Sequence, residues 1–134
     1  MKKIVFLLAT LFLISACENN PEKMDKKIPK EKLVEVKDGV FTEWYPGKKS
    51  IKFQGGQDEL GNRDGKWTFY AENGTELSYT QFSRGKKDGY SLVKYPNGNI
   101  HYTGEYQNDE MVGVWSTFDE KGNLLTKKEY GDRK

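Results

Sequence analysis

Hydrophobic and polar positions divide this chain into three parts. Residues 4–14 are apolar except for Thr10, residues 18–37 are largely charged, and from residue 39 onward short aromatic and β-branched runs alternate with turn residues. In the segment 100–106, Ile, Tyr, Gly and Tyr alternate with His, Thr and Glu. This period of two places the apolar residues on one face of an extended segment. The pattern predicts half-buried β-strands and an all-β fold class.

The glycines and aromatics of the third part repeat with a period of 24 residues. The repeated positions are Gly65, Gly89 and Gly113, then Gly74, Gly98 and Gly122, and finally Phe82, Tyr106 and Tyr130. A fixed period of this size indicates an array of supersecondary units. We therefore expect one domain over residues 38–134, with repeats at about 39–64, 65–88, 89–112 and 113–134.

Each repeat is predicted to form a β-hairpin. Its first strand is Trp67 to Ala71 or the equivalent, and its turn contains Asn73-Gly74, Asn97-Gly98 or Lys121-Gly122. Asn-Gly favours a type I′ turn, in which both central residues have positive φ. A second turn, at 84–89 or 108–113, leads to the next hairpin. All six repeated glycines are thus expected to be structural turn glycines in an elongated antiparallel meander of hairpins.

The first repeat is irregular. The segment 39–47 matches the opening strand and turn, and Phe53 fits the closing aromatic position. Residues 54–64 are five residues longer than their counterparts, which predicts an enlarged loop. Such a loop is either part of a terminal cap or a functional insertion. Residues 33–36 are a further candidate for an initial strand.

The repeats resemble a known family. The pattern Gly-x-Trp-x-x-aromatic, then Asn-Gly, then a Tyr about seven residues before the next Gly, is similar to the bacterial variant of the MORN repeat over roughly residues 39–130. This resemblance implies a slender antiparallel sheet. The middle copy departs from it, because Ser91 stands where its neighbours have Trp67 and Trp115. Some bacterial members are labelled antitoxins, so an antitoxin or immunity-type protein is a weaker alternative.

The N-terminus resembles that of a bacterial lipoprotein. Lys2 and Lys3 precede the apolar run, and Leu-Ile-Ser-Ala then leads directly to Cys17. This lipobox-like segment implies a signal peptide at 1–16, a lipid on Cys17 and a charged flexible tether at 17–37. The other interpretation is an ordinary secretory signal followed by a chance cysteine. In lipoproteins of diderm bacteria, Glu18 in place of Asp favours the outer membrane. In a single-membrane cell the protein faces outward.

Charge and composition argue against nucleic acid and against an enzyme. Removing residues 1–16 leaves 20 Lys+Arg and 20 Asp+Glu, so there is no cationic excess for nucleic acid. With Cys17 lipidated no thiol remains, and His101 is the one histidine. The carboxylates show no spacing that favours a catalytic pair or a calcium loop. We expect no catalytic residues, no metal and no cofactor.

Binding then depends on the aromatic residues. Those on or beside the first strands are Trp44, Tyr45, Trp67, Tyr70, Tyr95, Trp115 and Phe118. They either form the core of a thin domain or present a binding surface. One hypothesis is a protein-interaction or scaffold module, and another is a binder of cell-wall or surface glycan. Direct contact of the array with membrane lipid is weaker, because residues 38–134 carry 14 Lys+Arg and 15 Asp+Glu.

Overall fold

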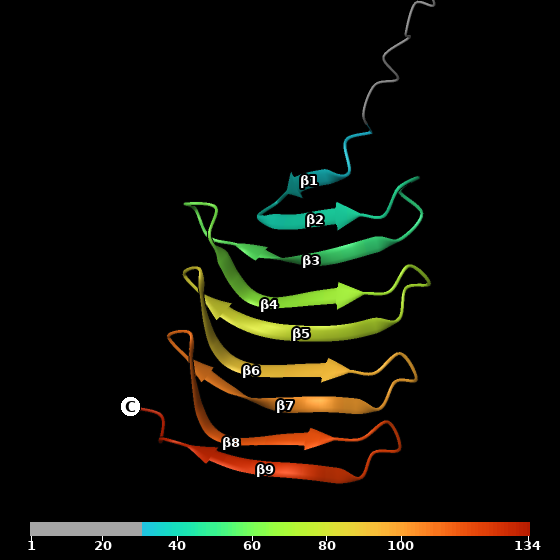
Figure 1. Cartoon of the computed structure of the whole chain (residues 1–134). Helices are drawn as coiled ribbons and strands as arrows, with labels where there is room; N and C mark the ends of the chain where they lie inside the picture. The colour runs from blue at the N-terminus through green and yellow to red at the C-terminus, as the bar shows by residue number, and fades with distance from the viewer. Residues whose placement is uncertain (1–30) are drawn as a thin grey trace, which may run out of the picture.

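The computed structural model describes residues 31–134, which form one nine-stranded antiparallel sheet whose strands follow one another in chain order (Figure 1). The strands are β1 (Val34–Lys37), β2 (Val40–Trp44), β3 (Ile51–Gln57), β4 (Arg63–Tyr70), β5 (Glu76–Ser83), β6 (Lys86–Lys94), β7 (Ile100–Gln107), β8 (Glu110–Phe118) and β9 (Leu124–Tyr130). The predicted all-β meander of hairpins is confirmed. The predicted signal peptide, Cys17 and the tether up to residue 30 lie outside the described residues.

The sheet begins earlier than the predicted domain boundary at residue 38. β1 pairs with β2, and Val36 lies opposite Phe41. Residues 34–37, assigned to the tether from their charge, are therefore a strand. The alternative prediction of an initial strand at 33–36 differs from the observed bounds by one residue at each end.

The turns within hairpins are not the predicted type I′ turns. In the second repeat the amide of Gly74 donates to the carbonyl of Ala71, and the amide of Ala71 donates to Thr75. Gly74 has φ +84°, whereas Asn73 does not have a positive φ. This is a type I turn followed by a left-handed glycine, which makes a three-residue hairpin loop. Asn73 instead accepts a hydrogen bond on its side chain from the amide of Thr75, at 3.0 Å.

The turns between hairpins are shorter than predicted. Arg84 and Gly85 have φ of 49° and 86°, and Asn108 and Asp109 have 48° and 72°. Two consecutive positive φ values identify these two-residue loops as type I′ turns, and Asp38-Gly39 between β1 and β2 shows the same pair of values. The predicted turns at 84–89 and 108–113 were too long, because β6 begins at Lys86 and β8 at Glu110.

Gly65, Gly89 and Gly113 lie inside strands, so their assignment as turn glycines was wrong. All three have positive φ, at 74°, 113° and 60°. Gly55 and Gly56 pair with Trp67 and Asp64, and the two residues between these partners have no counterpart on β3. The equivalent shifts occur where β5 meets β6 and where β7 meets β8. Each glycine thus supplies the left-handed backbone of a β-bulge that contains two extra residues.

The enlarged loop is only five residues long. β3 continues through Gln57, and residues 58–62 connect it to β4. The Asp58 carboxylate accepts hydrogen bonds from the amides of Leu60 and Asn62 and from the Asn62 side chain. The hydrogen bonds of the side chain and backbone of Asn62 hold the pKa of Asp58 below its ordinary value. The carboxylate therefore caps its own turn.

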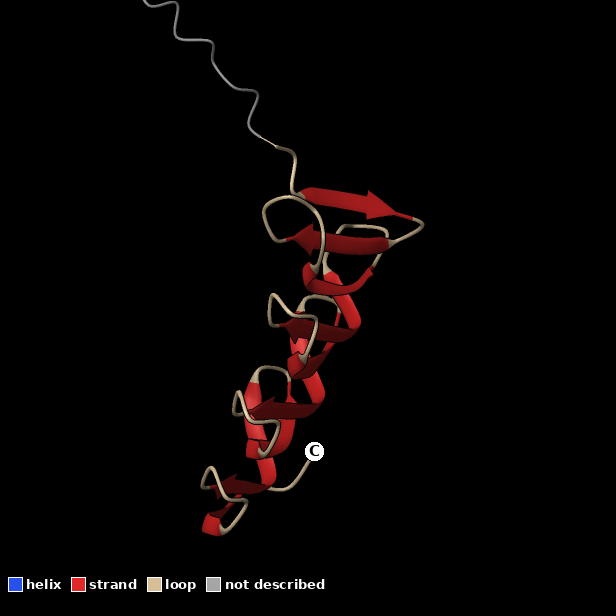
Figure 2. Cartoon of the chain, turned by 90° about the vertical axis from the view of Figure 1, so that its right-hand side faces the viewer, coloured by secondary structure: helices blue, strands red, loops and turns tan. Residues whose placement is uncertain are grey.

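The sheet is a single layer that extends along the direction in which the strands stack (Figure 2). One surface, called the aromatic face here, carries Phe41, Phe53, Trp67, Phe69, Phe82, Tyr102, Tyr106, Trp115 and Tyr130. The opposite surface, called the polar face, carries Thr42, Gln54, Thr68, Gln81 and Glu105, among others. Among the described apolar side chains, Trp67, Val112 and Trp115 are buried.

Candidate functional site

Trp67 and Trp115 are the core of the aromatic face. Trp67 lies opposite Gly55 on β3, where a Cβ atom would come within 2.3 Å of the indole. Trp115 lies over Gly104, where the corresponding distance is 2.1 Å. Only glycine allows the ring to lie this close to the neighbouring backbone. The tryptophans are 2% and 7% exposed, so the structure places these two candidate binding residues in the core.

The indole nitrogens strengthen this arrangement. Trp67 Nε1 donates to the carbonyl of Gly56 at 2.8 Å, and Trp115 Nε1 donates to the carbonyl of Glu105 at 3.1 Å. In both cases the acceptor belongs to the residue that follows the glycine under the ring. The pairing that places each indole ring over a glycine therefore also gives the buried indole N–H a hydrogen-bond acceptor.

The middle repeat replaces the tryptophan–glycine pair with two small hydroxyl residues. Ser91 pairs with Thr80 on β5, and their hydroxyl oxygens lie 2.8 Å apart. Ser91 is only 3% exposed. The position that lacks tryptophan is therefore packed and hydrogen-bonded. It divides the aromatic face into two clusters.

The first cluster surrounds Trp67. Its ring centroid lies 5.4 Å from that of Phe41, 6.0 Å from Phe53 and 6.4 Å from Phe82. Phe69 contacts Phe53 with a centroid distance of 5.1 Å. The phenylalanines are all half-buried, so each presents part of its ring to solvent.

The second cluster surrounds Trp115. Tyr102 and Tyr106 lie 6.2 and 4.9 Å from its ring. Together with Met111 and Tyr130 they line a pocket of about 370 Å³, to which Thr117, Thr126 and Lys128 contribute. Burial, and to a smaller extent Tyr106, raises the pKa of Tyr102. Tyr102 therefore stays protonated, and its ring and hydroxyl are neutral parts of this pocket.

Tyr45 and Tyr95 join neighbouring hairpins. The Tyr45 hydroxyl donates to the carbonyl of Tyr70, and the Tyr95 hydroxyl donates to the carbonyl of Phe118, both at 2.9 Å. The equivalent residue in the second repeat is Ala71, which has no such donor. Repeats one and three thus carry the bonding tyrosine, whereas repeats two and four carry the buried tryptophan.

The structure does not bring all seven candidate binding residues together. Trp44 and Tyr70 line a separate pocket of about 550 Å³ with Ile51, beside the hairpin turns. The Trp44 indole also donates to Glu35 at 3.3 Å. The Phe118 carbonyl accepts the hydrogen bond of the Tyr95 hydroxyl, which places Phe118 with the tyrosines that join hairpins. The candidates therefore fall into core, inter-hairpin and turn-side groups.

The sequence patterns did not predict the cations on the aromatic face. The Arg63 guanidinium carbon lies 4.4 Å from the Trp67 ring centroid and 5.3 Å from that of Phe82. Lys87 lies 4.7 Å from the Tyr106 centroid, and Lys128 lies 4.6 Å from that of Tyr130. These are cation–π distances. Arg63 and Lys87 both stand two residues before a repeated glycine, and that spacing was the available signal.

Charges on the polar face are paired with one another. Glu76 accepts from Lys66 at 3.4 Å and from Lys94 at 3.2 Å. Burial acts to raise the pKa of Glu76, but the hydrogen bonds and charges of the two lysines outweigh it and leave the pKa lowered. Arg133 forms ion pairs with Asp88 and Glu105. These polar-face charges therefore form ion pairs within the described residues, whereas Arg63 and Lys87 on the aromatic face form none there.

Two features bear on metal and membrane sites. Within residues 31–134, no three His, Cys, Asp or Glu side chains group in a way that could hold a metal ion. His101 packs on Tyr95, with ring centroids 4.4 Å apart. No helix in the described part of the chain is long and apolar enough to cross a bilayer.

Two of the hairpins match the model of a known repeat family. Residues 87–108 and 111–132 match the MORN repeat variant. These segments correspond closely to β6–β7 and β8–β9, so each match covers one hairpin. No curated protein shows significant similarity to this chain.

Proposed function

We propose that this chain is a non-catalytic, protein-binding lipoprotein of the cell envelope. The carrying observation is the aromatic face, on which half-buried rings line one surface of a single-layer sheet. Clusters of partly exposed aromatic side chains are typical of interaction sites. The two MORN repeat variant hairpins support a repeat-based interaction module.

The anchor is part of the same proposal. It rests on the charged start of the chain, its short apolar run and the position of Cys17. A lipid on Cys17 would hold the sheet at a membrane surface through the charged segment that precedes β1. We assign it to the outer membrane in a diderm cell, and otherwise to the outer face of the cell membrane.

Co-purification tests the partner. The full-length chain is extracted from its own cells in mild detergent and compared with the variants F53S and Y106S, which change half-buried rings on the aromatic face. Y90S is the matched control, because Tyr90 is 58% exposed and pairs with Glu105 on the polar face. We expect a stoichiometric protein that both aromatic-face variants lose and Y90S retains, with unfolding midpoints measured for all three.

Two results would contradict the binding proposal. If no protein co-purifies with the wild-type chain, the interaction-module interpretation fails. If wall or surface glycan is retained instead, and the same two variants release it, the aromatic face binds carbohydrate.

Membrane fractionation tests the anchor. The variant C17A should leave the membrane fraction or accumulate at the unprocessed mass, whereas C17S serves as a second thiol-free variant. A C17A protein that stays with membranes at the mature mass would exclude lipid attachment at this residue.

A further inference from the structure

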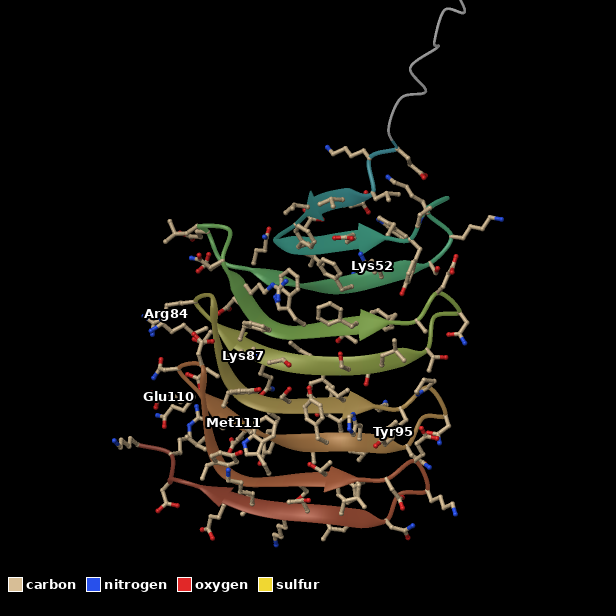
Figure 3. All side chains as sticks on the ribbon, viewed as in Figure 1. Lys52, Arg84, Lys87, Tyr95, Glu110 and Met111 are labelled. Atoms are coloured by element: carbon tan, nitrogen blue, oxygen red, sulfur yellow. The ribbon has the colours of Figure 1, made fainter. Side chains whose placement is uncertain are left out.

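One end of the aromatic face carries a row of cations and rings on successive strands. In strand order the row contains Arg63, Phe82, Lys87, Tyr106, Met111 and Tyr130, and it is called the cation–aromatic stripe below. Phe82 pairs with Lys87 and Tyr106 with Met111 in the sheet register. Figure 3 shows the labelled Lys87 and Met111 near the same end of the sheet.

Arg63 is held in place without using its hydrogen-bond donors. Its guanidinium lies against Trp67 and Phe82, and the side chain is half-buried. Within residues 31–134 it forms no side-chain hydrogen bond and no ion pair. A guanidinium has five N–H donors in a planar fork that matches a carboxylate. Contact with two rings limits its motion, which reduces the entropy lost on binding an anion.

Lys87 repeats this arrangement two strands away. Its ammonium lies over Tyr106, and its backbone is fixed because its amide donates to the Asp109 carboxylate at 2.8 Å. In the described part of the chain Lys87 also has no ion pair. By contrast, Lys66 lies over Tyr79 on the polar face and is paired with Glu76. The aromatic face therefore offers cations to an external anion, whereas Lys66 is already neutralised.

We infer that the cation–aromatic stripe binds an acidic, proline-containing segment of the partner protein in a polyproline II conformation. This inference rests on the proposed protein-binding function. Arg63 on β4 and Lys87 on β6 are two strand spacings apart across the sheet, or roughly 10 Å. They are also offset by two residues along the strands, because Phe82 pairs with Gly65 on one side and with Lys87 on the other. In polyproline II, residues i and i+3 point to the same side and are about 9 Å apart. Acidic side chains three residues apart can therefore reach both cations, because the long stems of Arg63 and Lys87 add to the span.

The rings between the cations suit the rest of such a segment. Phe82 lies between Arg63 and Lys87 in the stripe, and Tyr106 follows Lys87. Proline-rich segments bind grooves lined by aromatic side chains, because the rings pack on prolines and the ligand loses little entropy. A β-strand ligand fits less well, because its residues i and i+3 point to opposite sides.

Charge count argues against anionic lipid as the occupant. Four cations lie over rings of the aromatic face, and Lys52 among them is paired with Glu43, which leaves Arg63, Lys87 and Lys128. Segments that bind anionic headgroups typically contain four to eight clustered cations. Three cations spread from β4 to β9 suit a peptide with a few carboxylates.

The direct test measures peptide binding to the full-length chain in detergent. The probe is a capped twelve-residue peptide of four Glu-Pro-Pro units, and Gln-Pro-Pro and Lys-Pro-Pro peptides of equal length are controls. We expect saturable binding of the acidic peptide by calorimetry, and at least tenfold weaker binding of both controls. Raising the salt concentration should weaken binding of the acidic peptide, because salt screens the attraction between its carboxylates and the two cations.

Variants locate the binding site. R63Q and K87Q should each weaken binding of the acidic peptide at least fivefold. R63K should restore part of the affinity that R63Q loses. K66Q is the matched control, because it removes a lysine that also lies over a tyrosine, but on the polar face. We expect less than a twofold change for K66Q. Unfolding midpoints separate loss of binding from loss of fold.

Several outcomes would overturn the inference. One is equal affinity for the Glu-Pro-Pro and Gln-Pro-Pro peptides, and another is an equal effect of K66Q and R63Q on that affinity. A third is that no peptide binds, whereas the chain binds phosphatidylglycerol vesicles and R63Q abolishes this binding. Co-purification distinguishes this inference from the proposed function. If the double variant R63Q/K87Q binds the cellular partner as tightly as the wild-type chain does, the stripe is not the binding site. The proposal that the chain is an interaction module is then unaffected. If the wild-type chain has no protein partner, the proposed function itself fails.

Discussion

Ser91 and Thr80 share a hydroxyl–hydroxyl hydrogen bond at the register position where Trp67 lies on Gly55 and Trp115 lies on Gly104. The two kinds of pair are alternative solutions to one packing problem. A large ring requires a neighbour without a Cβ atom, whereas two small hydroxyl side chains fill the same place and satisfy each other.

This equivalence predicts a strong coupling between the two residues. The single variant S91W should be destabilised, because its ring would meet the Thr80 side chain. The double variant S91W/T80G should recover much of that loss, with a coupling of about 1–3 kcal/mol. Denaturant unfolding of the wild type, both single variants and the double variant measures it. Additive effects of the two substitutions would show that the middle repeat cannot adopt the tryptophan arrangement.

The inter-hairpin tyrosine predicts a smaller effect. Y95F removes the donor to the Phe118 carbonyl and should lower the free energy of unfolding by about 1 kcal/mol. Y90F is the control, because the Tyr90 ring is largely exposed. Its free energy of unfolding should stay within about 0.5 kcal/mol of the wild-type value. Equal effects of the two variants would mean that the 2.9 Å contact of Tyr95 contributes no stability.

The type I′ turn at Arg84-Gly85 predicts a stabilising substitution. Arg84 has φ +49°, a conformation that Asn tolerates better than Arg does. R84N should therefore raise the free energy of unfolding by about 0.5 kcal/mol. R84V should lower it, because a β-branched residue is strained at positive φ. The opposite order in thermal unfolding would contradict the turn assignment.

Asp58 and Asp119 predict how stability depends on pH. Hydrogen bonds from Asn62 and Asn123 lower the pKa of the two carboxyls in the folded chain. Their contribution is fully present above the unfolded pKa, near 3.9, and is lost as the pH falls through the lower folded pKa. Thermal unfolding should therefore occur at lower temperature as the pH falls from about 5 to 2. In D58N/D119N this dependence should be weaker, and an unchanged slope would assign it to other carboxyls.

The large features of the fold follow from the sequence because they depend on periodicity. The 24-residue step of glycines and aromatics predicts hairpins, and the alternation in 100–106 predicts a half-buried strand. Tyr102, Gly104 and Tyr106 do share one face, where Trp115 contacts both tyrosines. Local spacing was sufficient for these predictions, because a strand has a period of two.

The turn types and the candidate site depend on features that spacing does not show. Asn73-Gly74 has the composition of a type I′ turn, but the hairpin there closes with a three-residue loop. The two-residue bulge at Gly89 changes the register between β5 and β6. Without that register, the pairing of Phe82 with Lys87 could not be predicted.

The alternation of tyrosine and tryptophan repeats also determines how this array could change in length. Its true translational unit is two hairpins, which span four strand spacings or about 19 Å. Deleting the single hairpin 89–112 would place Trp115 against Thr80, whose Cβ occupies the space that a tryptophan needs. Deleting or inserting a pair of hairpins keeps every ring on its glycine. Length variants that change by pairs of hairpins should therefore keep the tryptophan packing that deletion of hairpin 89–112 alone disrupts.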